Sequence, residues 1–465
     1  MMKTSSINKL ESNFDSAILR LKEFLSIESI STDINKLSDC HAAADWVFNE
    51  LNSIGFRSKK VVEGGLPAII SHGPVVKGAP HVLFYGHYDV QPADDLDAWI
   101  LPPFQPDVVY RNEVKIIHGR GAADDKGQLL TFIEACRALY ESTGIPINIS
   151  FLIEGEEEIG SPSIENVINK YQNELKADVV FISDTSMVED NTPTIGCQLR
   201  GFLGEIITIK GPSHELHSGN YGGAAHNPAA LLVRAISKIY EDDGSINLKD
   251  FYKGVDEIPF EILKDWLKLD AFGNFYLESV GLSTASGEKD RHIIEKIWSR
   301  PCFEINSIFS GYQGAGFKTI IPSTATAKIS FRLVDDQDPE HIRAVFRKHI
   351  RENIPGDCNV FFESYGSVKA VKMNCHSSEF VLAQEKLREV WGRKCVFAGM
   401  GGSIPAVSSF KKYLGLDSML LGFSRSNDNI HSANEKFDYE CFTKGALSWV
   451  LILQEMKVTP PEYEI

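Results

Sequence analysis

The residues with the most chemical potential in this chain are acids and histidines placed where apolar runs end. Several of them border glycine-containing motifs such as GHYDVQP, GRGAADDKG and EGEEEIGS. The set comprises His87, Asp89, Asp124, Glu157, Glu158, Asp184 and His431. Two imidazoles and several carboxylates are the ligands that a pair of divalent metal ions requires. The residue types therefore predict a metal-dependent hydrolase.

Taken singly, these residues have ordinary structural explanations. A run of three glutamates at 156–158 suits a solvated turn, Asp184 suits a turn or helix start, and His431 suits a polar surface loop. The spacing His87-x-Asp89 is common, although a metal-binding imidazole usually donates its other N–H to such a carboxylate. The run GRGAAD resembles a dinucleotide-binding loop only superficially, because Asp124 would repel a pyrophosphate.

The elements that must position these residues alternate along the chain. Apolar runs predict strands at 67–71, 81–86, 147–153 and 177–183, and apolar periodicity predicts helices at 8–27, 40–54, 126–141 and 163–174. Such alternation predicts an α/β fold with a mixed, largely parallel sheet flanked by helices. Since ligands bind at the carboxyl ends of parallel strands, residues that follow three of these strands are expected to meet in space.

The middle of the chain has a different hydrophobic pattern. LGEIITIKG and ATAKISFRLV alternate with a period of two, and helices are expected near 227–241 and 339–353. This indicates an inserted two-layer α+β domain with a mainly antiparallel sheet. The alternation of strands and helices resumes with the helix SSEFVLAQEKLREVW, the strand SMLLGF and a last helix from about residue 435. We therefore predict a discontinuous catalytic domain at 1–197 and 378–465, with a lid inserted at 198–377.

Composition limits the classes of partner. The 465 residues and 43% hydrophobic content favour two domains, and the formal charge of −16 argues against nucleic acid or an anionic membrane. No apolar window is long enough to span a bilayer, and the first residues lack the apolar centre of a signal peptide. The eight cysteines are dispersed without a C-x-x-C pair, so we expect reduced thiols and a cytoplasmic location.

The motifs together, in their order, resemble the family of cocatalytic metallopeptidases that includes carnosinase, cytosolic nonspecific dipeptidase, acetylornithine deacetylase and aminoacylase. The resemblance covers nearly the whole chain and rests on GHYDVQP, GRGAADDKG, the EE-x-GS of EGEEEIGS, LHSGNYGG, FRLV, GGSIP and HSANE. LHSGNYGG and GGSIP are most similar to the dipeptidase branch. The resemblance implies a zinc-exopeptidase-like catalytic domain with a lid and dimerisation domain.

The same resemblance implies two metal ions, with Zn²⁺ the first expectation and Mn²⁺ or Co²⁺ as alternatives. One ion would be bound by His87, Asp124 and Asp184, and the second by Asp124, Glu158 and His431. Two dications bring four positive charges, of which the three carboxylates cancel three. The remaining positive charge would favour a bound hydroxide and attract a substrate carboxylate.

Catalysis is expected to use Glu157 and Asp89. By resemblance Glu157 is the general base that takes a proton from a water bridging the metals, and Asp89 orients the ligating imidazole. The family's glutamate pair directly precedes x-G-S, which leaves Glu156 without a catalytic role. The family also implies a cis peptide between Asp124 and Asp125.

Substrate recognition is expected from the insert and from the glycine loop near residue 400. Of two candidate histidines, His214 and His217, the family match falls on His217, which would stabilise the oxyanion, often from the partner subunit. A clamp for the substrate's terminal carboxylate is expected from Arg332, Gly401, Gly402 and Ser403. The alternative for Arg332 is a buried structural ion pair. Other histidines, His118 and His376 among them, are expected to be structural.

These observations predict a homodimeric enzyme that hydrolyses dipeptides or short peptides with a free C-terminal carboxylate. N-acyl amino acid deacylation is an alternative because it uses the same metal centre. A catalytically inactive peptide-binding protein on the same fold is an alternative of another class, although the complete ligand set and Glu157 argue against it. No complete phosphate-binding loop and no G-x-S-x-G motif is present.

Overall fold

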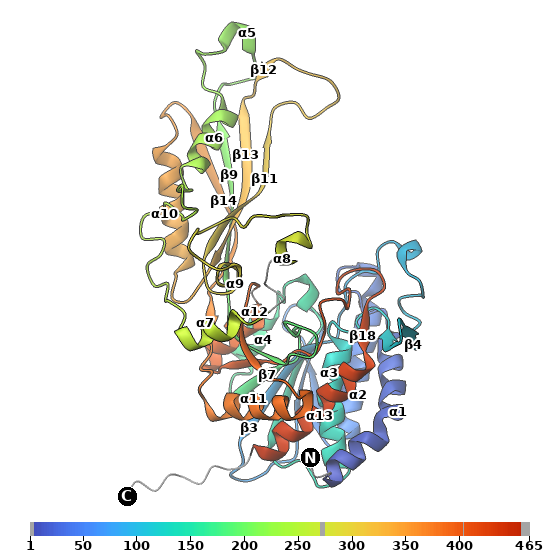
Figure 1. The fold of residues 1–465 in the computed structure, drawn as a ribbon. Coiled ribbons are helices and arrows are strands. Elements are labelled where there is room, and N and C mark those ends of the chain that lie inside the picture. Colours follow the sequence, from blue (N-terminus) through green and yellow to red (C-terminus); the bar gives the residue numbers. More distant parts are fainter. Residues whose placement is uncertain (1–3, 270–274, 403, 457–465) are drawn as a thin grey trace, which may run out of the picture. The chain divides into compact units, whose positions relative to one another are not determined.

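The computed structural model describes residues 4–269, 275–402 and 404–456, and the chain divides into two compact units (Figure 1). Unit 1 comprises Met1–Cys197, Met373–Ala398 and Pro405–Ile465, and unit 2 comprises Gln198–Lys372 and Gly399–Ile404. The chain passes from unit 1 to unit 2 after Cys197. The chain returns to unit 1 at Met373 rather than at residue 378, and the glycine loop at 399–404 groups with unit 2.

A mixed sheet forms the centre of unit 1. Its strands run in the order β1-β2-β6-β3-β7-β17-β8-β15, with β16 also paired to β8. The bounds are β1 Arg57–Val61, β2 Ala68–His72, β3 His81–His87, β6 Asn148–Glu154, β7 Val179–Ile182, β8 Thr194–Leu199, β15 Val371–Lys372, β16 Val396–Met400 and β17 Ser418–Leu420. The four central strands β6, β3, β7 and β17 are parallel, and the pairings nearer both edges are antiparallel. The predicted α/β class and the mixed sheet flanked by helices are confirmed, but the sheet is less parallel than predicted, because parallel pairing is confined to its four central strands.

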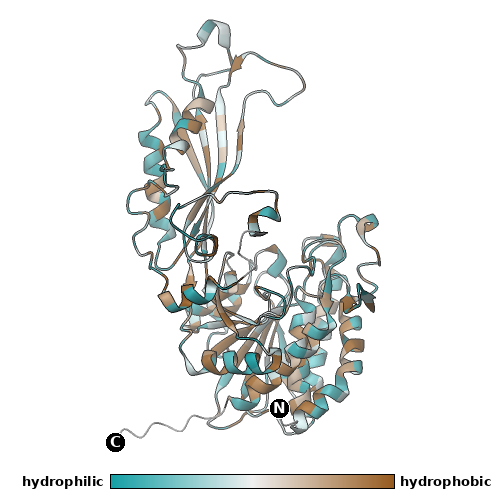
Figure 2. Cartoon of the chain, viewed as in Figure 1, coloured by the Kyte–Doolittle hydropathy of each residue, from teal (hydrophilic) through white to brown (hydrophobic). Residues whose placement is uncertain are grey.

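Helices cover the sheet of unit 1 on both faces. They are α1 Ser5–Leu25, α2 Leu37–Ser53, α3 Lys126–Tyr140, α4 Ile164–Lys170, α11 Ser378–Trp391, α12 Pro405–Ser409 and α13 Tyr439–Glu455. On one face, Phe84 of β3 stacks on Phe132 of α3 with ring centroids 3.9 Å apart, and Trp449 of α13 contacts both rings. On the other face, Tyr85 contacts Phe410. These strands are therefore buried on both sides. Figure 2, in which brown marks hydrophobic residues, shows how apolar the central strands are.

A small antiparallel sheet, β18-β5-β4, was not anticipated from the sequence. Its strands are β4 Asp107–Arg111, β5 Val114–His118 and β18 Lys436–Asp438. β4 is largely exposed and lacks a long apolar run, so it carries no strong strand signal. The pairing of β18 with β5 brings the segment after His431 beside the segment before Asp124.

Two cysteines correct the expectation of uniformly reduced thiols. Cys197 and Cys375 form a disulfide, with Cα atoms 6.2 Å apart. The amide of Met373 donates to the carbonyl of Cys197, which brings the two segments within the range that a disulfide requires. The free cysteines are Cys40, Cys136, Cys302, Cys358, Cys395 and Cys441. Among the described residues, no helix combines the length and apolarity needed to cross a membrane.

Unit 2 is a two-layer α+β structure. Its antiparallel sheet has the order β11-β13-β9-β14, with a two-stranded ribbon β10-β12. The strands are β9 Gly201–Lys210, β10 Leu216–His217, β11 Cys302–Ser310, β12 Ile320–Ile321, β13 Thr324–Leu333 and β14 Asn359–Val368; the helices are α5 Ser218–Tyr221, α6 Pro228–Ser237, α7 Phe260–Trp266, α8 Phe275–Glu278, α9 Ile293–Trp298 and α10 Pro339–Glu352. Alternate residues of β9 and β13 pack with α6 and α10 into one core, as the period-two pattern predicted.

Candidate metal centre

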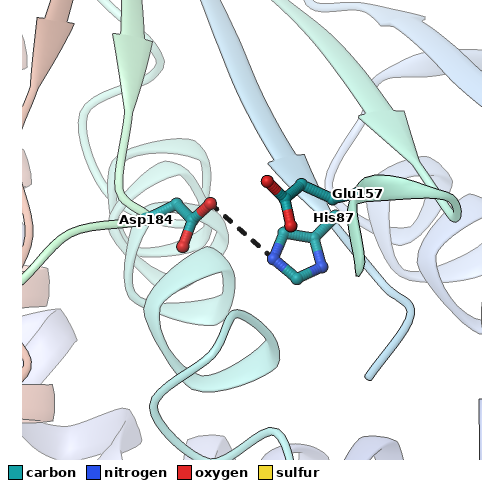
Figure 3. Close-up of side chains that lie close together, drawn as sticks. All are labelled: His87, Glu157 and Asp184. Carbon is teal, nitrogen blue, oxygen red and sulfur yellow. Dashed lines mark ion pairs between the residues drawn. The ribbon is translucent and has the colours of Figure 1, made fainter. Parts of the chain in front are cut away.

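Three neighbouring strands of unit 1 deliver the first group of candidate ligands. His87 is the last residue of β3, Glu157 lies in the turn after β6, and Asp184 follows β7. Because β6, β3 and β7 are adjacent and parallel, their carboxyl ends meet at one edge of the sheet. Figure 3 shows these side chains pointing toward one another, with donor atoms within 4.8 Å.

His87 is at the centre of this group. It is fully buried, and its Nε2 lies 3.2 Å from Oδ1 of Asp124 and 3.7 Å from Oδ2 of Asp184. Its Nδ1 lies 3.3 Å from Oδ1 of Asp89. The Nε2 atom of the ring therefore faces the candidate ligands, while the Nδ1 atom contacts the carboxylate of Asp89. Metal-binding imidazoles are usually oriented in this way.

A second group, formed by Asp124, Glu158 and His431, lies beside the first, and Asp124 stands close to His87 of the first group. Nε2 of His431 lies 2.8 Å from Oδ2 of Asp124 and 3.1 Å from Oε2 of Glu158. The two oxygens of Asp124 thus face His87 and His431 respectively. A carboxylate that offers one oxygen to each of two imidazole-bearing sites has the arrangement of a bridging ligand. The peptide between Asp124 and Asp125 is cis, as the resemblance implied.

Asp89 organises both the imidazole and the glutamate turn. Besides its contact with His87, its Oδ1 accepts a hydrogen bond from the amide of Glu157 at 3.3 Å. Its Oδ2 accepts one from the amide of Glu158 at 3.2 Å. This buried carboxylate therefore fixes the turn that presents the two glutamates, a function that the sequence did not reveal.

The cluster contains more negative than positive charge, and the pKa values of Asp184, Glu157 and both histidines are raised. Burial, followed by the charge of Asp124, raises the pKa of Asp184 well above its usual range. Burial is also the main cause that raises the pKa of Glu157 to about 7. Hydrogen bonds to Asp124 and Glu158 raise the pKa of His431 to about 10. Burial lowers the pKa of His87, but its contacts with Asp124 and Asp89 outweigh this and raise it well above the usual value.

The donor set fits divalent metal ions. It consists of imidazole nitrogens and carboxylate oxygens, the ligands of zinc and manganese sites. Oε1 of Glu158 is buried without a hydrogen-bond partner, although such atoms are normally satisfied in native structures. The donor atoms form the groups His87, Glu157, Asp184 and Asp124, Glu158, His431. In the first group Glu157 takes the place that the sequence analysis gave to Asp124, which stands 3.2 Å from His87.

The predicted substrate-binding residues belong to the other compact unit. His217 ends β10 and accepts a hydrogen bond from the amide of Gly219 at 3.0 Å, and its side chain is exposed. Arg332 lies on β13 with its guanidinium 5.3 Å from the ring of Phe202. The carbonyl of Gly401 accepts from Arg200, and Gly402 is exposed. Ser403 lies outside the described residues. Their part in substrate binding stays a prediction.

Several residues around the cluster were missed by the sequence analysis. Nε2 of Gln91 donates to Oε2 of Glu158 at 2.8 Å, and Oδ2 of Asp125 accepts from the amide of His87 at 3.2 Å. Glu435 accepts hydrogen bonds from the loop that carries Asp124. A signal was available, because all three are polar residues inside motifs that already contain a candidate ligand.

Comparison with known proteins places this site in a family. Residues 83–455 match peptidase family M20/M25/M40. The chain is an M20 peptidase. The match runs from β3, which carries His87, to the last helix and so includes every candidate metal ligand. The predicted family resemblance and the hydrolase class are confirmed.

Relatives of this M20 peptidase include dipeptidases. The Cys-Gly metallodipeptidase dug1 of Schizosaccharomyces pombe is 30% identical over 96% of this chain and 97% of its own length. The human Beta-Ala-His dipeptidase is 28% identical over 81% of this chain and 74% of its own length. These similarities agree with the dipeptidase branch that the motifs indicated.

Solved structures of the family share the fold. The dipeptidase Dug1p from Saccharomyces cerevisiae has a TM-score of 0.79 and 27% identity, covering 98% of this chain and 99% of that chain. The metallo-carboxypeptidase Sso-CP2 from Sulfolobus solfataricus has a TM-score of 0.82 and 27% identity, covering 95% and 99%.

Proposed function

We propose that this M20 peptidase is a two-metal dipeptidase that hydrolyses dipeptides or short peptides with a free C-terminal carboxylate. The observation that carries the proposal is the position of Asp124, whose oxygens face His87 at 3.2 Å and His431 at 2.8 Å. His87, Asp124 and Asp184 would hold one ion, and Asp124, Glu158 and His431 the other. Relatives named as dipeptidases support this choice of substrate.

The ions, most simply Zn²⁺ with Mn²⁺ or Co²⁺ as alternatives, would polarise the scissile carbonyl and acidify the attacking water. Glu157 would accept the proton of that water at its carboxylate and return it to the leaving amine. Asp89 would hold His87 in the tautomer that presents Nε2 to the site.

Arg332 is proposed to bind the substrate's terminal carboxylate, together with Gly401, Gly402 and Ser403. Among the described residues, no carboxylate lies within ion-pair distance of Arg332, so the alternative of a structural ion pair has no support. Its contact with Phe202 holds the side chain while leaving the guanidinium donors available.

We further propose a homodimer formed through the inserted unit, with His217 reaching the partner's substrate. The strands β11 and β14 support this, because they form the two edges of the sheet and expose Phe309, Phe361 and Tyr365. Sedimentation velocity tests it, and a monomer at micromolar concentration would contradict it.

The cytoplasmic location is also a proposal. It rests on the dispersed cysteines, whereas the Cys197–Cys375 disulfide calls for oxidising conditions. Cell fractionation, with thiol alkylation before lysis, would report both the location and the state of this pair.

The activity is tested with a panel of matched substrates. Protein stripped of metal and refilled with Zn²⁺ or Mn²⁺ is assayed with simple dipeptides, the same dipeptides amidated at the C-terminus, and N-acetyl or N-succinyl amino acids. We expect metal-dependent cleavage of the free dipeptides and at least about tenfold slower cleavage of the amides, since a charged hydrogen bond is worth about 1.5–3 kcal/mol. Arg332→Lys, which keeps the charge but loses the forked donors, should remove most of that preference.

Other outcomes would redirect the assignment. Preferential cleavage of acyl amino acids would keep the metal mechanism and make the enzyme a deacylase. Binding of dipeptides without cleavage, with two metal ions bound, would favour a peptide-binding protein. Equal cleavage of free and amidated dipeptides would contradict the carboxylate clamp alone.

A further inference from the structure

Glu435 is a buried carboxylate beside the candidate metal centre that the proposed chemistry does not use. It closes the motif HSANE, four positions after His431, and its side chain is essentially inaccessible to solvent. A carboxylate in such surroundings is tolerated only when its oxygens are well satisfied. Here the hydrogen-bond donors come almost entirely from the loop that leads to Asp124.

The loop offers its backbone amides to this one carboxylate. Oε2 of Glu435 accepts from the amide of Gly121 at 2.9 Å, and Oε1 accepts from the amides of Ala123 at 2.9 Å and Asp124 at 3.2 Å. Gly121 has φ +81°, and a Cβ there would meet Val90 at 2.6 Å. Neighbouring N–H groups of one loop turned to the same side in this way form a concave anion site, which Glu435 fills.

Arg120 ties the carboxylate to a second motif. Its Nη1 donates to Oε2 of Glu435 at 2.7 Å, and its Nη2 donates to the carbonyl of Pro92 at 2.9 Å. The guanidinium is as buried as the carboxylate, so neither charge can be removed without leaving the other unpaired. The loop before Asp124, the segment after Asp89 and the segment after His431 are therefore joined at one point.

These contacts of Glu435 fix the position of Asp124 relative to His431. Glu435 holds the backbone amide of Asp124, whose side chain faces His431 at 2.8 Å, and Glu435 and His431 share one short loop. His431 and Asn434 both adopt the left-handed region, with φ of 60° and 65°. That backbone is disfavoured for residues other than glycine and must be held by its contacts. His87 and Asp184, in contrast, are placed by strand ends and need no such tie.

We infer that Glu435 is a positioning residue that sets the distance between Asp124 and His431 and so controls the affinity of the metal site that contains His431. The inference rests on the proposed two-metal site. It assigns to Glu435 no contact with metal or substrate, only the placement of two residues that would make such contacts. Glu435→Gln keeps the side-chain volume but turns an N–H₂ group toward Arg120 or the amides, so that donors face donors.

The test is a metal titration of metal-stripped protein, with Zn²⁺ competed against a chromophoric chelator. Wild-type protein should bind two ions per chain. In Glu435→Gln one ion should bind as in the wild type and the other about 10- to 100-fold more weakly, the usual effect of losing a residue that orients a ligand. Hydrolysis of a dipeptide by this variant should recover as Zn²⁺ is raised, because the ligands themselves are intact.

Asp438→Asn is the matched control. Asp438 is also a buried carboxylate in this segment, paired with Lys436 at 2.8 Å and with Arg425, and it contacts no candidate ligand. It should leave both metal affinities unchanged. If Glu435→Gln does not fold, Arg120→Lys provides the second variant, with a smaller weakening of the same site expected.

The possible outcomes distinguish a failure of the positioning role of Glu435 from a failure of the two-metal centre. Unchanged affinities in a folded Glu435→Gln protein, or an equal loss in Asp438→Asn, would overturn the positioning role while leaving the metal centre intact. A wild-type protein that binds fewer than two ions would overturn the metal centre itself and this inference with it.

Discussion

At the scale of single residues, the three consecutive glutamates 156–158 illustrate how position assigns different roles to one side chain. Glu156 is buried and accepts a hydrogen bond from Ser163, away from the candidate ligands. Glu157 and Glu158 point to the cluster, and only Glu158 contacts His431. A general base must stay free of tight bonds to act, which suits Glu157.

Replacement of Glu157 by Gln should abolish turnover while both metal ions stay bound. Glutamine keeps the shape but cannot accept the proton, so kcat should fall at least about 100-fold, in the range that acid–base catalysis contributes. Steady-state kinetics with metal analysis by mass spectrometry measure both effects. Glu156→Gln is the control and should retain most activity. A near-native kcat in Glu157→Gln would show that the base is another group.

His118 gives a pH dependence that is independent of the metal centre. It is fully buried, its Nε2 donates to the carbonyl of Leu101 at 3.0 Å, and its Nδ1 accepts from Arg111 at 3.3 Å. Burial lowers its pKa in the folded state. Because the unfolded chain then binds the proton more readily, stability present above the unfolded pKa of about 6.5 is lost as the pH falls below it.

The free energy of unfolding of the wild type, measured relative to that of His118→Gln, should therefore decline from pH 7 to pH 5.5. Glutamine keeps one donor and one acceptor but does not titrate. Urea unfolding of the metal-stripped protein at several pH values measures the slope. His376→Gln, at an exposed position, should behave as the wild type. Parallel slopes for wild type and His118→Gln would refute this role.

The candidate ligands could be predicted at this scale because residue type and sequence motif are enough to indicate metal-binding side chains. Asp89 was also predicted, as the residue that orients His87, but its bonds to the glutamate turn and the contributions of Gln91 and Glu435 were not. Asp89, Gln91 and Glu435 act through backbone amides and side chains that the fold, not the sequence spacing, brings near. Nothing in HSANE says that its last glutamate folds back onto the segment before Asp124, more than 300 positions earlier.

At the scale of elements, the site depends on how closely the strand ends approach each other. Tyr88 lies between His87 and Asp89, is fully buried, and donates its hydroxyl to the carbonyl of Pro67 at 2.7 Å. Gly155, at the end of β6, lies so near that a Cβ would come within 2.1 Å of the Tyr88 ring. This glycine is required by close packing between two strand ends.

Gly155→Ala should therefore harm both stability and metal binding. The rigid ring cannot move aside without shifting its neighbours, and such overpacking costs about 1–3 kcal/mol. Urea unfolding and the Zn²⁺ titration together measure the effects. Gly356→Ala, where a Cβ meets nothing within 4 Å, is the control and should change little. Native stability and metal affinity in Gly155→Ala would contradict the packing argument.

The elements that the sequence predicted best are those buried on both faces. Strands β3, β6 and β7 are nearly continuous apolar runs, and their ends agree with the predicted bounds within a few residues. β4 was missed because its residues are exposed or half-buried, and β5 because it is a short strand of which only the last three residues are buried. Their pairing with β18 is a long-range event that local periodicity cannot report.

At the scale of the whole molecule, metal binding and stability are expected to be linked. The site gathers several buried carboxylates, of which Asp184 and Glu157 have raised pKa values because of burial and, to a lesser extent, the neighbouring charge of Asp124. Ions that bind only the folded chain add stability, about 2.7 kcal/mol per site at 100 times Kd. The insert at Gln198–Lys372 has its own core and contributes none of these ligands.

Chelation should therefore lower the melting temperature by several degrees, and Zn²⁺ should restore it. Unit 1 carries the site, so the unfolding of unit 1 should shift most. Differential scanning calorimetry with and without chelator measures the change. An unchanged melting curve in protein verified to be free of metal would count against the site.

The most direct test of the account is the appearance of activity during a metal titration. Metal-stripped protein is titrated with Zn²⁺ while bound metal and hydrolysis of an unmodified dipeptide are followed in the same samples. We predict negligible turnover without metal and full turnover only when two ions are bound per chain. Full activity in verified metal-free protein, or no hydrolysis with both sites filled, would contradict a two-metal dipeptidase.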